Sequence, residues 1–239
     1  MSLAQKKFYE NMVYRYVDIP RLRVVFRLLE GYRAKSILDV GCGDGSICKK
    51  IGEIVRASQL QGVEINQKAI GVARRAKTEA TAVNLDEDDL PFDNYFDLVV
   101  ALEILEHLFD PDHVVKEIKR VLRPNSLFII SIPNLAWWVN RLVLLLGYQP
   151  YFTEVSTTSN KIGKLSVRQP DPVGHLRVWT YRSFREFALF HGFHIVKIDG
   201  AAFSSGASWV ILEKMDSLLS AMPSLSSFIV SLLRKREVC

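Results

Sequence analysis

The stretch Ile37-Leu38-Asp39-Val40-Gly41-Cys42-Gly43-Asp44-Gly45 decides the fold, because a short apolar run leads directly into three alternating glycines. Such glycines allow a tight turn and let the backbone approach a ligand closely, as in nucleotide-binding loops that follow a strand and open a helix. The glycines alone do not identify the ligand. A dinucleotide fingerprint has its third glycine where this chain has Ser46, and no Lys-Ser or Lys-Thr pair follows as in a phosphate-binding loop.

Outward from this loop, short apolar runs alternate with helix-like stretches, which is typical of a parallel sheet covered by helices. Strands are predicted over Ser36–Val40, Leu60–Glu64, Ala80–Asn84, Phe96–Ala101 and Leu127–Ile132. Helices are predicted from the loop to Ile54, over Asn66–Lys77, and from Pro111 to a point before Pro124. The pattern predicts an α/β fold with a mostly parallel sheet and helices on both faces.

The length of 239 residues fits one domain, 1–239, with four parts. Residues 1–33 hold two N-terminal helices, Leu3–Tyr14 and Asp18–Leu29, and residues 34–134 form the ligand-binding core. Residues 135–174 interrupt the alternation and read as an insertion on the acceptor side. Residues 175–239 complete the sheet and end in a helix over Leu218–Arg234.

The insertion begins with an apolar stretch, Leu135–Leu146, that is too short and too polar in the middle to span a bilayer. Three roles stay open for it: a lid over the acceptor, a core helix, or docking on a membrane surface. The same ambiguity holds for Leu218–Arg234. Peripheral membrane contact is therefore expected, if anywhere, through residues 135–148 or through the C-terminal helix.

Composition and charge narrow the class of protein. The formal net charge of +5 is scattered, and helix ends in solvent explain the basic runs without a nucleic-acid partner. Three cysteines without metal-type spacing, and an N-terminus with Lys6, Lys7 and Glu10 in place of an apolar run, predict a cytoplasmic protein, with membrane-peripheral placement as the alternative. The sequence does not predict an oligomeric state.

Two carboxylates flank the glycine loop in the predicted sheet. Asp39 lies two residues before the first glycine, where it suits the ammonium of a methionine moiety and would repel a pyrophosphate. Glu64 ends the second strand and is placed to accept hydrogen bonds from a ribose diol, a role that dinucleotide enzymes share. The pair favours a nucleoside with an attached amino acid.

At this point the residues resemble the class I S-adenosylmethionine-dependent methyltransferase family. The family's first motif is matched by Ile37–Gly45, and its acidic residue after the second strand by Glu64. Asp89-Leu90-Pro91-Phe92 and Phe96-Asp97-Leu98-Val99-Val100 match two later motifs in order. Leu122-Arg123-Pro124-Asn125 resembles the family's turn before the fifth strand, with Asn125 where glycine is usual; asparagine tolerates positive φ.

The resemblance covers about residues 34–134 and again Thr180–Phe193. It implies a Rossmann-like fold with a seven-stranded sheet, and S-adenosylmethionine as methyl donor with S-adenosylhomocysteine as product. Residue by residue, it implies a cofactor site made of Asp39, Gly41, Cys42, Gly43, Gly45, Glu64, Ile65, Asn84, Leu85, Asp86, Ala101 and Leu102. Asn84, Leu85 and Asp86 would contact adenine, and Ala101 and Leu102 the sulfonium end.

Candidate catalytic groups converge on Glu103, Glu106 and His107, which share one face if the segment is helical, together with His175. We expect His107, His175 and Glu103 to act on the acceptor, with a general base as one role. The Glu-x-x-Glu-His segment resembles ubiquinone-pathway O-methyltransferases, and with the later His175 it resembles the metal site of small-RNA 2′-O-methyltransferases. A metal at Glu103, Glu106, His107 and His175 is the alternative; the main expectation is no divalent metal.

The sequence thus predicts an S-adenosylmethionine-dependent methyltransferase that acts, preferably on oxygen, on a small-molecule, lipid-linked or glycan acceptor. Residues 147–154 would form part of the acceptor wall. Two alternatives remain: a metal-assisted RNA or polyol O-methyltransferase, and a cofactor-binding partner subunit without turnover. The acceptor itself is not predicted, because fold and cofactor do not name a substrate.

Overall fold

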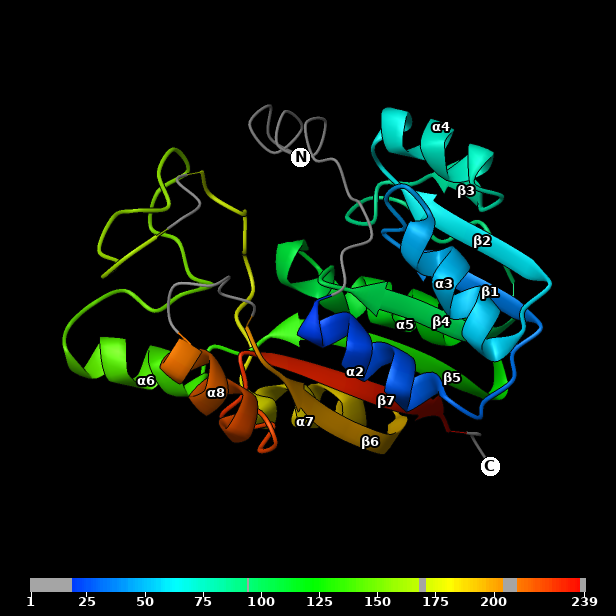
Figure 1. The fold of residues 1–239 in the computed structure, drawn as a ribbon. Coiled ribbons are helices and arrows are strands. Elements are labelled where there is room, and N and C mark those ends of the chain that lie inside the picture. Colours follow the sequence, from blue (N-terminus) through cyan, green and yellow to red (C-terminus); the bar gives the residue numbers. More distant parts are fainter. Residues whose placement is uncertain (1–18, 94, 168–170, 204–209, 237–239) are drawn as a thin grey trace.

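The computed structural model describes residues 19–93, 95–167, 171–203 and 210–236. Seven strands form one sheet in the order β3-β2-β1-β4-β5-β7-β6 (Figure 1). The strands are β1 (Ser36–Val40), β2 (Gln59–Glu64), β3 (Glu79–Ala82), β4 (Phe96–Leu102), β5 (Leu122–Pro133), β6 (Phe193–Ala201) and β7 (Phe228–Lys235). The helices are α2 (Pro20–Leu29), α3 (Ser46–Val55), α4 (Gln67–Arg75), a 3-10 turn η1 (Leu105–His107), α5 (Pro111–Val121), α6 (Trp138–Leu145), α7 (Tyr181–Phe190) and α8 (Val210–Leu219).

The predicted mostly parallel sheet of seven strands is confirmed. Strands β1 to β5 pair in parallel, whereas β7 runs antiparallel to both of its neighbours, β5 and β6. Val40 lies opposite Val63 of β2 and Ala101 of β4. The carboxyl ends of the three central strands therefore meet at one edge of the sheet, where open α/β folds place their ligands.

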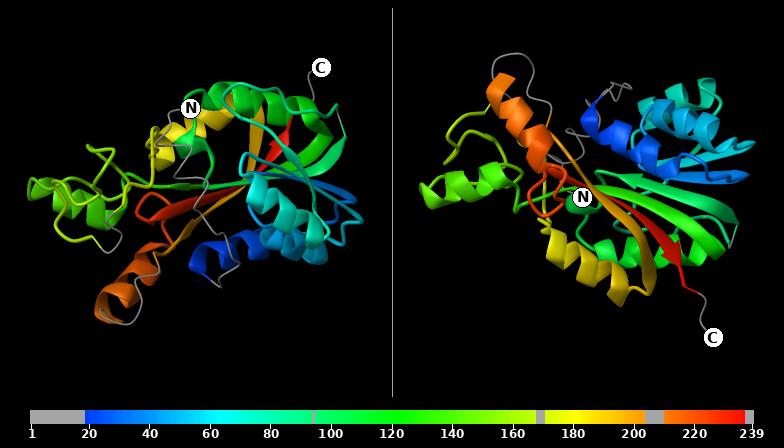
Figure 2. Two further views of the ribbon diagram at one scale, coloured as in Figure 1. Left: turned by 90° about the horizontal axis from the view of Figure 1, so that it is seen from above. Right: turned by 60° about the horizontal axis from the view of Figure 1, so that its bottom comes forward.

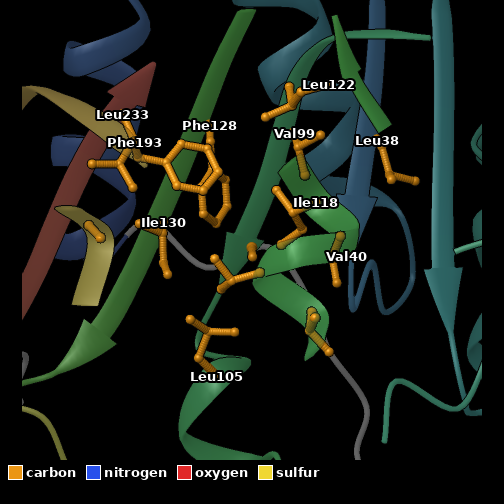
Figure 3. Close-up of a cluster of buried hydrophobic side chains, with 14 of the residues drawn as sticks. Leu38, Val40, Val99, Leu105, Ile118, Leu122, Phe128, Ile130, Phe193 and Leu233 are labelled. Atoms are coloured by element: carbon orange, nitrogen blue, oxygen red, sulfur yellow. The ribbon is translucent and has the colours of Figure 1, made fainter. Parts of the chain in front are cut away.

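Helices cover both faces of the sheet (Figure 2). On one face, α5 and α7 pack on apolar side chains of the strands, including Ile118 of α5 and Val99 of β4 (Figure 3). On the other face, α2 and α3 bury Val25 and Ile51 against Ile37 and Val100. Burial on both sides explains why the parallel strands are continuous apolar runs.

Local signals in the sequence start and end several elements as predicted. Pro111 is the first residue of α5, and Asp110 caps this helix by accepting a hydrogen bond from the backbone N–H of His113 at 3.0 Å. Asn125 has φ +60°, the conformation expected where relatives have glycine. The predicted helix Asp18–Leu29 appears as α2, and the predicted helix Leu3–Tyr14 lies outside the described residues.

The prediction of a terminal helix over Leu218–Arg234 is wrong. Helix α8 ends at Leu219, and residues 228–235 form β7, which inserts between β5 and β6. Ile229, Val230, Leu232 and Leu233 are all buried there, on both faces of the sheet. An apolar run of this length fits a buried strand as well as one face of a helix. The pairing with β5 and β6 makes it a strand. The proposed membrane contact through a C-terminal helix falls with the helix.

Candidate functional site

A cavity of about 470 Å³ opens at the carboxyl ends of β1, β2 and β4. Its size is in the range of small-molecule sites. Of the residues predicted for the cofactor, those that line the cavity are Asp39, Gly41, Cys42, Gly43, Glu64, Ile65, Asn84, Leu85, Asp86 and Leu102. Gly45 and Ala101 stand outside this lining.

The glycine loop has the strained geometry that its composition predicts. Gly41, Gly43 and Gly45 have φ of +76°, +52° and +76°. A Cβ on Gly41 would lie 2.1 Å from the Ile104 side chain, so close packing reinforces the need for glycine there. Gly45 instead precedes α3, and a Cβ on it would meet Thr78 Oγ1 at 2.8 Å. Gly45 therefore contributes to the shape of the loop without lining the cavity.

Asp39, the last residue but one of β1, lines the cavity and is buried. Burial, reinforced by the charge of the nearby Glu64, raises the pKa of this carboxyl to about 8. A cation beside it would reverse the shift by favouring the carboxylate. That this carboxylate pairs with the ammonium group of a methionine moiety stays a prediction.

Glu64 is held by three backbone N–H groups. Gly43 N donates to Oε2 at 3.0 Å, and Ile65 N and Asn66 N both donate to Oε1 at 2.9 Å. The carboxylate thus fixes the glycine loop against the start of α4. Since each carboxylate oxygen has two lone pairs, Oε2 can also accept from a ribose hydroxyl.

Asn84, Leu85 and Asp86 form the opposite wall, after β3. Asp86 Oδ1 accepts a hydrogen bond from Phe109 N at 2.8 Å, and Asn84 Oδ1 accepts one from Asp86 N at 3.3 Å. These bonds fix a turn whose apolar member, Leu85, packs against the core. The wall combines a flat apolar surface with amide and carboxylate groups, which suits a purine ring.

On the acceptor side, the structure separates Glu103 from the other predicted groups. Glu103 has φ +58° and leaves the line of β4, so the helical face assumed for this segment does not form. Its Oε1 lies 2.8 Å from Arg21 Nη1 and accepts a hydrogen bond from Ser131 Oγ at 2.9 Å. Glu103 therefore lines the cavity while it is ion-paired with Arg21.

Glu106, His107 and His175 come together, with potential ligand atoms within 4.8 Å of one another. His107 Nδ1 lies 3.2 Å from Gly174 O and His175 Nδ1 lies 3.0 Å from Phe152 O. Because a carbonyl only accepts, each Nδ1 carries the hydrogen, and the lone pair is on Nε2.

The protonation states of this trio follow from burial. Burial and the neighbouring His175 lower the pKa of His107 to about 4, and burial lowers the pKa of His175. Both imidazoles are therefore neutral at pH 7. Burial raises the pKa of Glu106 to about 8, and both of its carboxylate oxygens are buried without a hydrogen-bond partner.

Sequence reasoning missed Arg21. This guanidinium is buried, lines the cavity from α2 and sits 5.3 Å above the Phe228 ring. Its pKa is lowered to about 10 by burial. No local pattern in the sequence singles out Arg21 within the predicted Asp18–Leu29 helix.

The predicted acceptor wall lies elsewhere in the insertion. None of residues 147–154 lines the cavity, whereas Val173 and His175 do. Glu154 holds the backbone before His175 in place, since its carboxylate accepts hydrogen bonds from Val173 N and, at 2.8 Å, from Gly174 N. Glu154 is therefore a positioning residue for the loop that carries His175.

Relatives share the core of this chain. A family model described as a methyltransferase domain matches residues 38–130. The ubiquinone biosynthesis O-methyltransferase of Idiomarina loihiensis is 31% identical over 143 residues, which are 54% of this chain and 57% of that protein. The protein of the same name from Alkalilimnicola ehrlichii is 33% identical over 123 residues, 48% of each. The chain spans about half the length of the curated relatives it matches.

Solved structures share the whole fold. A chain from the complex between the Haloferax volcanii Trm112 methyltransferase activator and a methyltransferase matches with a TM-score of 0.62 and 15% identity, over 90% of this chain and 88% of that one. An S-adenosylmethionine-dependent methyltransferase from Mesorhizobium loti matches with a TM-score of 0.59 and 17% identity, over 89% and 96%. The family match thus shows a methyltransferase domain over residues 38–130, and the solved structures show that the chain has the fold of S-adenosylmethionine-dependent methyltransferases.

Proposed function

We propose that this protein transfers the methyl group of S-adenosylmethionine to an oxygen of a small-molecule, lipid-linked or glycan acceptor. The observation that carries the proposal is one cavity with two chemically different ends. Asp39 and Glu64 line the end that suits the cofactor's ammonium and ribose, and the neutral imidazoles of His107 and His175 line the other. The relatives named as O-methyltransferases support oxygen as the acceptor atom.

When bound, S-adenosylmethionine supplies a methyl group already activated by its sulfonium. The chain's own residues then have two tasks: to align the acceptor and to take up its proton. His107 and His175 each present the unprotonated Nε2 of a fixed tautomer, which is the form that accepts a proton. Asp39 and Glu64 would hold the methyl donor, and the proton that the acceptor hydroxyl loses on methylation would pass to Nε2 of His107 or His175.

Calorimetry and a transfer assay test this proposal. The purified chain should bind both S-adenosylmethionine and S-adenosylhomocysteine, and Glu64→Ala should weaken both by about tenfold or more because it removes the ribose contact. Glu53→Gln, an exposed change on α3, is the control. Labelled methyl transfer into fractionated cell extract then identifies the acceptor pool. Failure to bind either compound contradicts the proposal.

A second candidate is metal-assisted O-methylation, favoured by the unpartnered carboxylate of Glu106 beside two neutral imidazoles. Among the described residues the trio Glu106, His107 and His175 would supply one carboxylate and two nitrogen ligands. An ion held by three protein ligands would have a further position for an acceptor oxygen. Glu103 is not a ligand in this arrangement, because it pairs with Arg21.

The two candidates make different demands on Nε2, which cannot bind a metal and accept a proton at once. Titration with Mg²⁺, Mn²⁺ or Zn²⁺ followed by calorimetry separates them. Binding at micromolar concentration that Glu106→Gln abolishes, with activity lost to a chelator, favours the metal. Unchanged activity in chelator favours the imidazole as proton acceptor.

A further inference from the structure

Helix α6 buries a polar side chain and exposes several apolar ones. Its buried polar residue, Asn140, is 1% exposed, and its amide donates to Leu135 O and Tyr151 O at 3.0 Å while Oδ1 accepts from Tyr151 N at 2.8 Å. The outward residues are apolar: Leu142, Leu144, Leu145 and Leu146 are 51%, 61%, 82% and 68% exposed. These four residues are called the leucine tip. A surface helix normally has the opposite arrangement.

The leucine tip belongs to a larger apolar end of the molecule. Gln149 N donates to Gly163 O at 2.8 Å, so the loop that contains Ile162 packs next to the end of α6. Ile162 and Leu165 in this loop are 53% and 54% exposed. Contiguous exposed apolar groups of this kind mark a surface that binds something.

The charge around this end is basic. Over residues 135–167 the charged side chains are Arg141, Lys161, Lys164 and Glu154, a net charge of +2. The one acid, Glu154, accepts hydrogen bonds from the backbone of Val173 and Gly174. Arg141 donates to two backbone carbonyls but is exposed, and so is Lys161. Apolar tips flanked by Arg and Lys fit the boundary between the acyl chains and the headgroups of an anionic bilayer. None of the described helices has the length and apolarity needed to cross a bilayer.

The same segment reaches the cavity. The insertion leaves the sheet after β5, carries the leucine tip in α6, and returns at Val173 and His175, which line the cavity. Figure 1 shows α6 and α8 together at one end of the molecule, and Asp216 of α8 accepts hydrogen bonds from the indoles of Trp137 and Trp138 at the start of α6. Ring contacts from Trp137 to Phe152 and from Phe152 to His175 connect the start of α6 with the acceptor side of the site.

We propose that the leucine tip docks the protein on an anionic membrane surface and that the methyl acceptor is an amphiphile reached from that surface. The second half of this inference rests on the proposed function, and the first half does not. An acceptor with an apolar tail keeps the tail in the bilayer while its oxygen enters past His175. The insertion then combines docking and recognition in one segment.

Vesicle sedimentation of the full chain tests the docking. Vesicles of phosphatidylcholine and phosphatidylglycerol should bind the protein, and phosphatidylcholine alone should bind it less. Leu144→Ser/Leu145→Ser should weaken binding by on the order of tenfold or more, because two apolar side chains no longer insert. Lys161→Glu should weaken binding to the anionic vesicles only.

Leu189→Ser/Phe190→Ser on α7 is the matched control, since these side chains are also apolar and 44% and 80% exposed. This pair should leave vesicle binding unchanged. The affinity of each variant for S-adenosylmethionine, measured by calorimetry, checks that the fold is intact.

Three outcomes overturn the docking proposal: no binding to either vesicle, equal loss from the α7 pair, or a dimer in gel filtration that the leucine substitutions dissociate. The last would assign the tip to a second copy of the chain. If the cofactor binds but vesicles do not, only this inference fails; if the cofactor does not bind, the proposed function fails.

Labelled methyl transfer tests the acceptor class. Vesicles made from a total lipid extract should accept the label, the water-soluble extract should not, and the leucine variant should lower transfer to the vesicles. Label that appears only in the water-soluble extract overturns the amphiphilic acceptor.

Discussion

Arg21 of α2 and Glu103 after β4 form an ion pair, with 2.8 Å between Nη1 and Oε1. The same guanidinium also interacts electrostatically with Glu106. Glu103 is fixed by Arg21 and by Ser131, while Glu106 lies with the two imidazoles. The acid that sequence spacing grouped with Glu106 is therefore ion-paired with Arg21 and does not join the two imidazoles, and α2 is tied to the site by a charge.

Arg21→Met should destabilise the fold by about 2 kcal/mol, because it leaves Glu103 without its counter-charge in a partly buried place. The double substitution Arg21→Met/Glu103→Gln should recover part of this loss, since it removes the unpaired charge. Urea unfolding of the two single variants and the double variant measures the coupling. Strictly additive effects would show that the pair contributes nothing.

Gly41→Ala should cost more stability than Gly31→Ala. Both glycines have positive φ, +76° and +82°, but a Cβ at Gly31 meets nothing within 4 Å, whereas one at Gly41 collides with Ile104. Gly31→Ala should cost about 1 kcal/mol from backbone strain alone. Gly41→Ala should cost more and also weaken cofactor binding, and Ile104→Ala in the same chain should recover part of the loss. Equal unfolding free energies for the two glycine variants would contradict this account.

The sequence predicted the elements whose signals are local. Gly41 and Gly43 required a turn at a strand end, Pro111 started a helix, and Asn125 took a positive φ. Each outcome depends on the φ preference of one residue or on a cap within one turn. For this reason the glycine loop itself could be predicted from neighbouring residues, whereas the other cofactor residues came from the family resemblance.

The sequence did not predict the features that depend on contacts between distant segments. The apolar run after Leu218 fits a helix face, yet Pro223 and the serines at 224, 226 and 227 end the helical region, and β7 follows because β5 and β6 offer it two partners. Arg21 is separated by 82 positions from Glu103, a spacing that no periodic pattern records. The acceptor side depends on such long-range pairs.

His107→Gln should lower kcat by about a hundredfold with little change in cofactor affinity, if His107 accepts the acceptor's proton. The unprotonated imidazole is present above its pKa, which burial lowers to about 4. At saturating S-adenosylmethionine, kcat should therefore stay level from pH 7 down to about pH 5 and fall only below that. An acid limb near pH 6.5 would show that His107 is as exposed to water as an ordinary histidine, and His113→Gln, on the surface of α5, is the control.

Cofactor affinity should rise with pH because of Asp39. Its pKa is about 8 in the free protein, so the carboxyl is mostly protonated at pH 6.5 and cannot pair with an ammonium. Between pH 6.5 and pH 8 the ionised fraction, and with it the affinity, should increase by about tenfold. Asp39→Asn should bind weakly at both pH values and show no such slope. Calorimetry in buffers of different ionisation enthalpy should also detect a proton released on binding to the wild-type chain.

For Asp39, the expected effect of rising pH on the stability of the fold is opposite to its effect on cofactor affinity. A carboxyl whose pKa is raised from 3.8 in the unfolded chain to about 8 in the fold binds its proton more tightly when folded, so stability falls as pH rises from about 4 to 8. Asp39→Asn removes this group while keeping its shape. The unfolding free energy of the variant should therefore rise relative to that of the wild type by up to about 4 kcal/mol between pH 5 and pH 8. A residue that lowers the stability of the fold but raises the affinity for a ligand has a role in binding that ligand. If Asp39→Asn loses both stability and affinity at pH 8, Asp39 instead has a structural role in the sheet.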